Sequence, residues 1–575
     1  SMQSNTTGAN NVAVGYTSLD ANTTGASNTA VGCAALTANT TAASNVSIGA
    51  DSMTTNTTGA ENVAVGASAL YTNATTSYNV AIGAGALYTN AAASNAAVGY
   101  HALFANTTGA SNVAVGYNAL DANTTAGDNT AVGTNALGAN TTGATNTAVG
   151  SGALDANTTA SNNTAVGVSA LGANTTGAGN VGIGQNALSS NTTAGDNTAV
   201  GTNALQDVTT GANNTAVGTS ALKENTGVSN TSVGRGALQN NTTGGDNVAV
   251  GHDALNDQTT AAQNTAVGRT AGGAVTTGSN NTHVGYDSGA SATTANNNTS
   301  LGSYTLQDNT ASDNTAVGTS ALKENTTGNY NVAVGRSAAK VNTTGANNTA
   351  VGYNALTANT TGSDNVAVGY RAGLLVTTGY NNTLVGEDAG DTITTGYGNV
   401  CVGINAITSI ANAEKQIVIG YNYNGNGDNK VNLGSDGGYV WNSFTVNNTW
   451  TQVSDERTKK NIESDDLGLN FINELRPVTF NWRHSSEIDP EFIEETVNIG
   501  RGEKDTETLI HGLIAQEVKA AMDSVGNTTF NGWEEGQDGQ AVSREMFITP
   551  LIKAVQELSI KVDDLTEKLN NSNCK

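Results

Sequence analysis

A glycine recurs at almost constant spacing through most of this chain, and this regularity restricts the fold more than any other feature. Counted on the last residue of the pentapeptide NVAVG, the series runs from Gly15 to Gly420 and contains 25 copies. Of the 24 intervals, 21 are 17 residues long and three are 16 residues long. A typical unit reads NTAVGTNALGANTTGAT from Asn129. Repeats of this kind indicate a solenoid, in which each repeat is one coil that stacks on its neighbours.

Each unit combines strand and turn patterns. NTAVG alternates with a period of two, so Thr130 and Val132 should share one face of a strand and Ala131 should take the other. NAL carries a Leu at a fixed offset, where we expect a second short strand, and NTTGA supplies turn residues. The unit therefore predicts one coil of a mainly β, parallel β-solenoid with ladders of Val, Leu and Asn. At roughly 4.8 Å per coil, the stack should be on the order of 120 Å long.

Composition divides the chain at Val453. Residues 1–453 hold 9 Lys or Arg and 23 Asp or Glu, whereas residues 454–575 hold 13 and 24. The formal net charge of −25 argues against a nucleic-acid partner, because phosphate binding needs basic patches. No run approaches the length of about 18 apolar residues that a membrane span needs. The three cysteines are isolated, so we expect no disulfide framework, metal site or cofactor.

The repeat NTAVGTNAL resembles the head repeats of YadA-like trimeric adhesins and the related repeats in shafts of phage and virus fibres. For residues 1–434 the resemblance implies a left-handed parallel β-roll assembled as a homotrimer, located on a virion as a tail fibre or surface spike. In such trimers a small-residue face meets the neighbouring chains, so the Ala position is expected at the interface. The first residues, SMQSNTTGAN, begin in mid-repeat, and we expect a missing N-terminal region that attaches the fibre to the virion. The alternative is a fragment of a bacterial trimeric adhesin on the cell surface.

A few positions depart from the repeat. The residue after the marker glycine varies freely, which indicates an exposed edge. There, Tyr100 with Tyr117 and Tyr353 with Tyr370 lie one coil apart. These pairs are either strips that contact a host glycan or protein receptor, or unconstrained surface residues. His283 occupies an Ala position, where three copies around an axis could hold an ion or where an irregularity is simply tolerated.

The Thr pairs of NTT raise a third class of function. Flat Thr ladders on a solenoid can match ice, although such ladders lie on strands and NTTGA is typical of a turn. An ice-binding solenoid is therefore kept as the least favoured alternative to a fibre.

After the repeats, residues 435–453 alternate aromatic and polar side chains. They form either a β cap that closes the open end of the solenoid or a distal tip, in which Trp441 and Trp450 would contact a receptor.

Residues 454–575 mix strand and helix patterns, as in a small α+β domain, and end in a helix expected at about 548–570. Its apolar residues alternate spacings of three and four, the heptad pattern of a coiled coil, and we expect them to mediate trimerisation. A trimer fits the shaft, whereas β-branched residues at heptad position a with Leu at position d favour a two-stranded coiled coil. The helix alone therefore does not determine the oligomeric state. The heptad residues are Ile548, Leu551, Val555, Leu558, Val562, Leu565 and Leu569.

The segments SDERTKKNI, LRPVTFNWR, HGLIAQEV and PLIKAVQEL, in this order, resemble the self-cleaving intramolecular chaperones of endosialidase-type tailspikes and fibres. The resemblance implies that residues 454–575 trimerise the chain, help the β-rich stalk to fold and then cut themselves off. Matched residue by residue, the nucleophile is Ser454, the base is Lys459 and the scissile bond is Val453–Ser454. The activity would be a single-turnover serine endopeptidase with no external substrate. A Ser–Lys dyad needs a Lys whose pKa is lowered by burial or a neighbouring cation.

Overall fold

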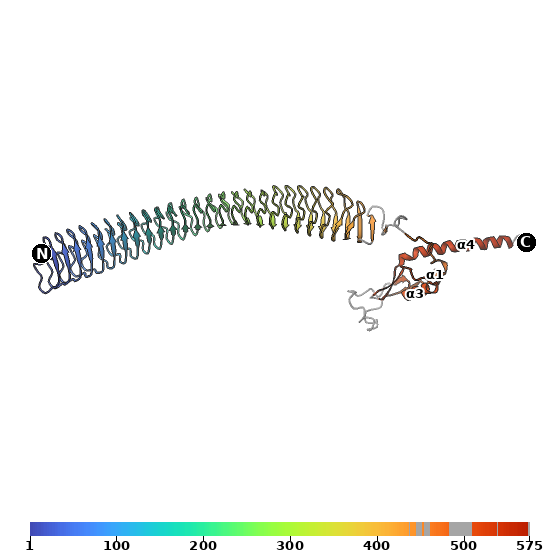
Figure 1. Ribbon diagram of the computed structural model, residues 1–575, viewed down its shortest axis with the longest axis horizontal. Coiled ribbons are helices and arrows are strands. Elements are labelled where there is room, and N and C mark those ends of the chain that lie inside the picture. The colour runs from blue at the N-terminus through green and yellow to red at the C-terminus, as the bar shows by residue number, and fades with distance from the viewer. Residues whose placement is uncertain (436–437, 444–450, 453–459, 482–508, 537–538, 573–575) are drawn as a thin grey trace. The chain divides into compact units, whose positions relative to one another are not determined.

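The computed structural model describes residues 1–435, 438–443, 451–452, 460–481, 509–536 and 539–572. The chain divides into two compact units, Ser1–Val453 and Ser454–Lys575 (Figure 1).

The first unit is a stack of parallel strands with one strand in each coil (Figure 1). Neighbouring strands pair in register, so that Ala131 lies beside Ala148. The predicted parallel β-solenoid is therefore confirmed. The repeat strands, each three residues long, are β1 (Val12–Val14), β2 (Thr29–Val31), β3 (Val46–Ile48), β4 (Val63–Val65), β5 (Val80–Ile82), β6 (Ala96–Val98), β7 (Val113–Val115), β8 (Thr130–Val132), β9 (Thr147–Val149), β10 (Thr164–Val166), β11 (Val181–Ile183), β12 (Thr198–Val200), β13 (Thr215–Val217), β14 (Thr231–Val233), β15 (Val248–Val250), β16 (Thr265–Val267), β17 (Thr282–Val284), β18 (Thr299–Leu301), β19 (Thr315–Val317), β20 (Val332–Val334), β21 (Thr349–Val351), β22 (Val366–Val368), β23 (Thr383–Val385) and β24 (Val400–Val402).

The parallel ladder continues through β26 (Ile417–Tyr421) to β28 (Lys430–Ser435) and then reverses direction. β29 (Gly438–Ser443) pairs antiparallel with β28, and β30 (Thr451–Gln452) pairs antiparallel with β29. The far side of β28 is thus covered by a hairpin, which protects it from pairing with another chain. That this segment is also a receptor-binding tip stays a prediction.

The core of each coil is lined by small residues and one Leu. In the coil of β8, Ala131, Ala136, Leu137 and Asn140 are fully buried, whereas Thr130 and Val132 lie on the outer face of the strand and are partly exposed. The prediction that the Ala position lies at the interface between chains is therefore wrong, and the Val ladder lies on the outer face instead of in the core.

The narrow interior explains why Ala occupies the strand centre. In β23 a Leu, Leu384, replaces that Ala, and Gly390 replaces the Leu of the same coil. A Cβ atom on Gly390 would lie 2.5 Å from Leu384 Cδ2. In this coil the interior thus holds one large side chain, which comes from the strand and not from the opposite wall.

The Leu segment is a turn in most coils, so the predicted second strand is wrong. Asn135 and Leu137 adopt positive φ values of 54° and 52°, which bends the backbone between them. The Leu137 amide still donates to the carbonyl of Ala153 in the next coil, at 3.0 Å. Only near the end of the stack does this segment pair as strands, between β25 (Ala406–Ile407) and β27 (Tyr423–Asn424).

The marker glycine is required by backbone packing. Gly133 has a φ of 141°, and a Cβ there would lie 2.4 Å from the carbonyl oxygen of Gly150 in the next coil. Any other residue would be strained and would also push the coils apart, which accounts for the constancy of the repeat.

Buried asparagines tie each coil to the next. Asn140 Nδ2 donates to Asn123 Oδ1 at 3.0 Å and to the Gly143 carbonyl at 2.9 Å, and its own Oδ1 accepts from Asn157 Nδ2 at 2.9 Å. A second row of asparagines is formed by the first residue of each repeat. In this row the backbone N–H of Asn146 donates to Asn129 Oδ1 at 2.9 Å. These rows satisfy backbone and side-chain groups that the coil buries.

The second unit is a small α+β arrangement. Its helices are α1 (Leu469–Glu474), α3 (Ala515–Ser524), the 3₁₀ helix η3 (Arg544–Phe547) and α4 (Ile548–Ser572). The strands among its described residues form two antiparallel pairs, β31 (Val478–Phe480) with β32 (Ile510–Gly512) and β33 (Trp533–Gly536) with β34 (Gly539–Val542). Phe471 of α1 is fully buried among Val518, Met522 and Phe547.

Candidate functional sites

The predicted cleavage site lies outside the described residues. Val453, Ser454 and Lys459 fall in the undescribed segment 453–459, and Trp450 falls in 444–450. The division of the chain into its two compact units nevertheless falls between Val453 and Ser454. The expected scissile bond is therefore at the unit boundary along the chain.

Helix α4 carries a long apolar stripe that the described residues of its own unit leave largely exposed. The predicted heptad residues all lie on α4 and are 47–65% exposed. The buried residues of this helix, Pro550 and Ala554, lie in its first two turns. A lone helix with an exposed heptad stripe is only marginally stable in water, so the stripe fits packing against other helices.

The first half of α4 is tied to the unit. The Glu557 carboxylate accepts a hydrogen bond of 2.7 Å from the amide of Leu469, the first residue of α1. Helix α1 has no side-chain cap of its own, so Glu557 takes that role. The ring of Phe471 also stacks on that of Phe547, which directly precedes α4, with centroids 6.1 Å apart.

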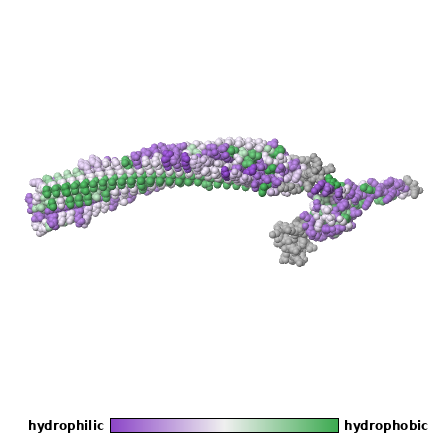
Figure 2. All heavy atoms as spheres, viewed as in Figure 1, coloured by the Kyte–Doolittle hydropathy of each residue, from purple (hydrophilic) through white to green (hydrophobic). Residues whose placement is uncertain are grey.

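The outer strand residues form an apolar band along the solenoid. Val115, Val149 and Val217 are each 37% exposed, and equivalent residues repeat from coil to coil. Figure 2 shows this band as a continuous hydrophobic line along one side of the first unit. We call it the valine stripe: the first and third residues of β1 to β24. An apolar surface this long on an otherwise polar rod marks an interaction face.

The predicted tyrosine pairs stack. The ring centroids of Tyr100 and Tyr117 are 5.5 Å apart, and those of Tyr353 and Tyr370 are 5.4 Å apart. All four rings are 39–53% exposed. Trp441 lies in β29, where Lys430 Nζ is 4.3 Å from its ring centroid. Contact of these residues with a receptor stays a prediction.

A second aromatic column was not predicted. Tyr71, Tyr88 and Phe104 stack with centroids 5.0 Å apart at each step, and His101 joins Phe104 to Tyr100. Each member of the column stands five positions after a marker glycine. Tabulating every variable position of the repeat, instead of only the first, would have found it.

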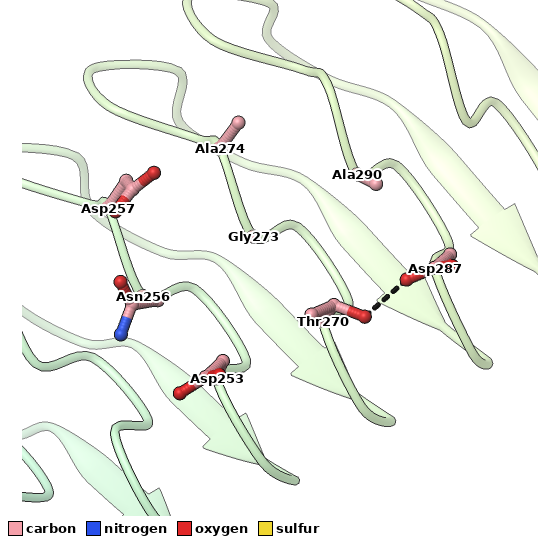
Figure 3. Close-up of a pocket in the computed structure, with 8 residues that line it drawn as sticks. All are labelled: Asp253, Asn256, Asp257, Thr270, Gly273, Ala274, Asp287 and Ala290. Atoms are coloured by element: carbon pink, nitrogen blue, oxygen red, sulfur yellow. Dashed lines mark hydrogen bonds between the residues drawn. The ribbon is translucent and has the colours of Figure 1, made fainter.

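An acidic hollow of about 370 Å³ opens on the coils of β15 to β17 (Figure 3). Asp253, Asp257 and Asp287 line it together with Thr270, whose hydroxyl donates to Asp287. Among the residues that the structure describes, no group of three or more His, Cys, Asp or Glu side chains is arranged to hold a metal ion.

His283 does not face other chains. Its side chain is fully buried in the core of its own coil, so three copies cannot meet around an axis, and that interpretation is wrong. Burial lowers the pKa of His283 to about 4.

The first Thr of NTT bonds to the next coil, whereas the second, such as Thr142, is exposed. Thr141 Oγ1, for example, donates to the Thr158 carbonyl at 3.0 Å. An ice-binding function stays the least favoured alternative, because these Thr residues lie in turns. In the described part of the chain, no helix has the length and apolar character of a membrane span.

Comparison with known proteins assigns the beginning of the second unit. Residues 454–527 match the family described as the chaperone of endosialidase, peptidase S74. No curated protein and no solved structure matches the chain. The match begins at Ser454, directly after the last residue of the solenoid unit. A parallel β-solenoid followed by a segment that matches this family fits a fibre-like protein.

Proposed function

We propose that this chain is a homotrimeric fibre protein of a phage or virus, whose C-terminal chaperone assembles three copies and then detaches by cleavage at Val453–Ser454. The observation that carries the proposal is the joining of a β-solenoid and an endosialidase-type chaperone in one chain. The host, the virion and the cleavage are parts of the proposal.

The valine stripe is the proposed interface between the chains of the shaft. Its residues are the exposed apolar side chains that recur in almost every coil, while the Ala residues once expected there are buried. Around a threefold axis, each stripe would pack against the stripes of two other chains and remove Val side chains from water. Burying a fully exposed side chain of this kind contributes about 1.5–3 kcal/mol, so a Val that is 37% exposed would gain roughly a third of that, and the stripe repeats this gain along its length.

The exposed stripe of α4 supplies what the valine stripe lacks, which is register. Near-identical coils can pair out of register almost as well as in register. A coiled coil of three α4 helices would align the chains at one end before the slow, non-local β assembly proceeds.

Cleavage would then separate the chaperone from the finished fibre. Lys459, in its neutral form, takes the proton of the Ser454 hydroxyl, and Ser454 Oγ attacks the Val453 carbonyl carbon, on the same or a neighbouring chain. The peptide nitrogen leaves with a proton, and water hydrolyses the resulting ester to give a carboxylate at Val453. The helper that promoted assembly is then absent, which makes the fibre kinetically stable.

Host attachment completes the proposal. The stacked tyrosines and Trp441 offer aromatic surfaces for a host glycan or protein receptor, and Trp450 is proposed on sequence grounds alone.

The cleavage test compares wild type with Ser454→Ala and Lys459→Arg by denaturing gel and by sequencing the new N-terminus. We expect wild type to release a fragment beginning at Ser454, while both variants remain at 575 residues. Wild type that stays whole, or a Ser454→Ala variant that is still cut, would contradict the protease assignment.

The interface test replaces Val149 by Asp, with Thr142→Asp on an exposed turn as the matched control. Light scattering should report trimers for the control and a loss of trimers for Val149→Asp. Equal trimer content in both variants would show that the valine stripe is not the interface.

A further inference from the structure

The hydrophobic core of the solenoid is interrupted at one place along its described length. One cluster of buried apolar residues runs from Leu19 to Ala295, and a second runs from Leu306 to Tyr423. The gap between them falls in the coils of β17 and β18.

Polar residues occupy the core positions in this gap. At the strand centre, His283 and Ser300 replace Ala, and Ser288 and Thr305 stand three residues after their marker glycines, where Ala is usual. All four side chains are fully buried. Gly289 takes the place of the core Leu, and a Cβ there would lie 2.2 Å from His283 Nδ1, so the imidazole fills the space that Leu would need.

The four side chains form one hydrogen-bonded chain. His283 Nδ1 lies 2.7 Å from Ser300 Oγ, which lies 2.6 Å from Ser288 Oγ. Ser288 Oγ lies 3.2 Å from Thr305 Oγ1. His283 Nε2 is buried with no hydrogen-bond partner among the described residues. An unpaired buried polar atom of this kind weakens the coil that holds it.

Buried hydroxyls alone do not interrupt the core. In the coil of β3, Ser47 and Ser52 form a similar pair at 2.5 Å, yet Met53 fills the Leu position and the cluster is continuous there. What distinguishes the gap is the imidazole together with a glycine at the Leu position of the same coil, Gly289. A glycine at the Leu position does not interrupt the core by itself, because the clusters are continuous at Gly272 and at Gly373.

No charged group compensates a proton on His283. Apart from His283, the ionisable side chains of the coils of β16 to β18 are Arg269, Tyr286, Asp287, Tyr304, Asp308 and Asp313. All of them lie at the surface, exposed or partly exposed, and none is bonded to the imidazole. Burial is the cause of the low pKa of His283, and no neighbouring charge contributes. The positive form is therefore poorly tolerated in the closed core.

We propose that the coils of β17 and β18 are an acid-sensitive joint of the shaft, which opens locally when His283 takes up a proton while the coils on both sides stay folded. Solenoid coils contact only their neighbours, so one pair of coils can open without the rest.

The direction and size of the effect follow from linkage. The opened coils bind a proton with the ordinary pKa of 6.5, whereas the closed coils bind it near 4. The opening equilibrium is therefore independent of pH above about pH 6.5, and it becomes more favourable as the pH falls from 6.5 towards 4. Between pH 7.5 and pH 5, the opening equilibrium should rise on the order of 30-fold.

Hydrogen exchange of the full chain tests the joint at single-coil resolution. Peptides within 276–309 are compared with peptides from the coils of β8 to β10, at pH 7.5 and pH 5, after correction for intrinsic exchange. We expect protection to fall on the order of 30-fold at pH 5 in 276–309 only. No loss of protection, or an equal loss in both regions, would overturn the proposal.

Variants connect the effect to the imidazole. His283→Ala restores the usual core residue, and adding Gly272→Leu and Gly289→Leu restores the consensus coil. Leu fits this backbone, because φ is 59° and 61° at the two glycines and 52° at Leu137. Both forms should lose the pH dependence in 276–309, whereas His252→Ala, at a partly exposed surface histidine, should keep it. Persistence of the pH dependence in both restored forms would also overturn the proposal.

Discussion

The asparagine ladder should respond to substitution in a way that depends on the replacing side chain. In Asn140→Ala, three hydrogen bonds are lost, those to Asn123 Oδ1 and the Gly143 carbonyl and that from Asn157 Nδ2. Gly143 keeps a donor in Asn129, at 3.0 Å, and Asn157 keeps an acceptor in the Ala160 carbonyl, at 3.0 Å. Asn123 Oδ1 is left buried without a donor, at a cost of about 1–3 kcal/mol.

The ladder already ends in this manner at two natural sites. Val208 and Val376 replace ladder asparagines, and the preceding Asn191 and Asn359 each hold an Oδ1 with no partner. The chain thus tolerates one orphan acceptor when an aliphatic side chain fills the space. Asn140→Ala adds an unfilled volume to the same orphan, so its total cost should be at least about 2 kcal/mol, and Asn140→Val should cost less.

Hydrogen exchange of peptides covering 124–158 measures the difference directly. Protection should fall at least about 30-fold in Asn140→Ala, the equivalent of about 2 kcal/mol, and several-fold less in Asn140→Val. Thr142→Ala, at an exposed turn in the same coil, is the control. Equal protection in Asn140→Ala and the control would refute the idea that the ladder holds the coils together.

Three further outcomes are expected. Ala148→Ile should destabilise the coil of β9 by about 1–3 kcal/mol, because the larger side chain overfills the narrow core. Val149→Thr in the same strand should leave hydrogen exchange within its coil nearly unchanged. Equal effects of the two substitutions would mean that the inner and outer faces of the strand are wrongly assigned. Glu557→Ala should increase exchange at the start of α1 by removing the acceptor of the Leu469 amide, and unchanged exchange there would dismiss the capping role. Burial raises the pKa of the Cys401 thiol to about 12. At pH 8 a thiol reagent should therefore modify exposed Cys33 and leave Cys401 unmodified until the chain unfolds, as measured by peptide mass spectrometry. Similar modification rates at the two cysteines would contradict the buried position of Cys401.

The repeat period was sufficient to predict the solenoid, but hydropathy misassigned its faces. Val is more apolar than Ala, so a pattern argument puts Val132 inside. The interior between the strand and the opposite wall has room for Leu137 and only a methyl group at Ala131. The strand faces are therefore set by the space available inside the coil. That space depends on how tightly the coil closes, which the sequence of a single repeat does not show.

The turn at NAL was also beyond local reasoning. Leu rarely adopts positive φ, so Leu137 was expected in a strand, yet burial of its side chain and the bond from its amide to Ala153 stabilise that conformation. Repetition strengthens such unusual geometry, because the same strained residue recurs against the same neighbour in each coil.

Candidate sites were predictable to different degrees. The variable column after the marker glycine correctly indicated rings that lie one coil apart, as in Tyr100 and Tyr117. The heptad pattern correctly located an apolar stripe on α4. The assigned roles of Ser454 and Lys459 rest on family resemblance, and the match from residue 454 supports the family without testing the two side chains.

Native mass spectrometry of the purified wild-type protein tests the central proposal most directly, because it reads assembly and cleavage together. We expect complexes of three chains that each end at Val453, with the fragment from Ser454 released or separately detectable. A species made of single chains, whether cut or whole, or of three chains that still carry all 575 residues, would contradict the proposal of a trimeric fibre matured by its own chaperone.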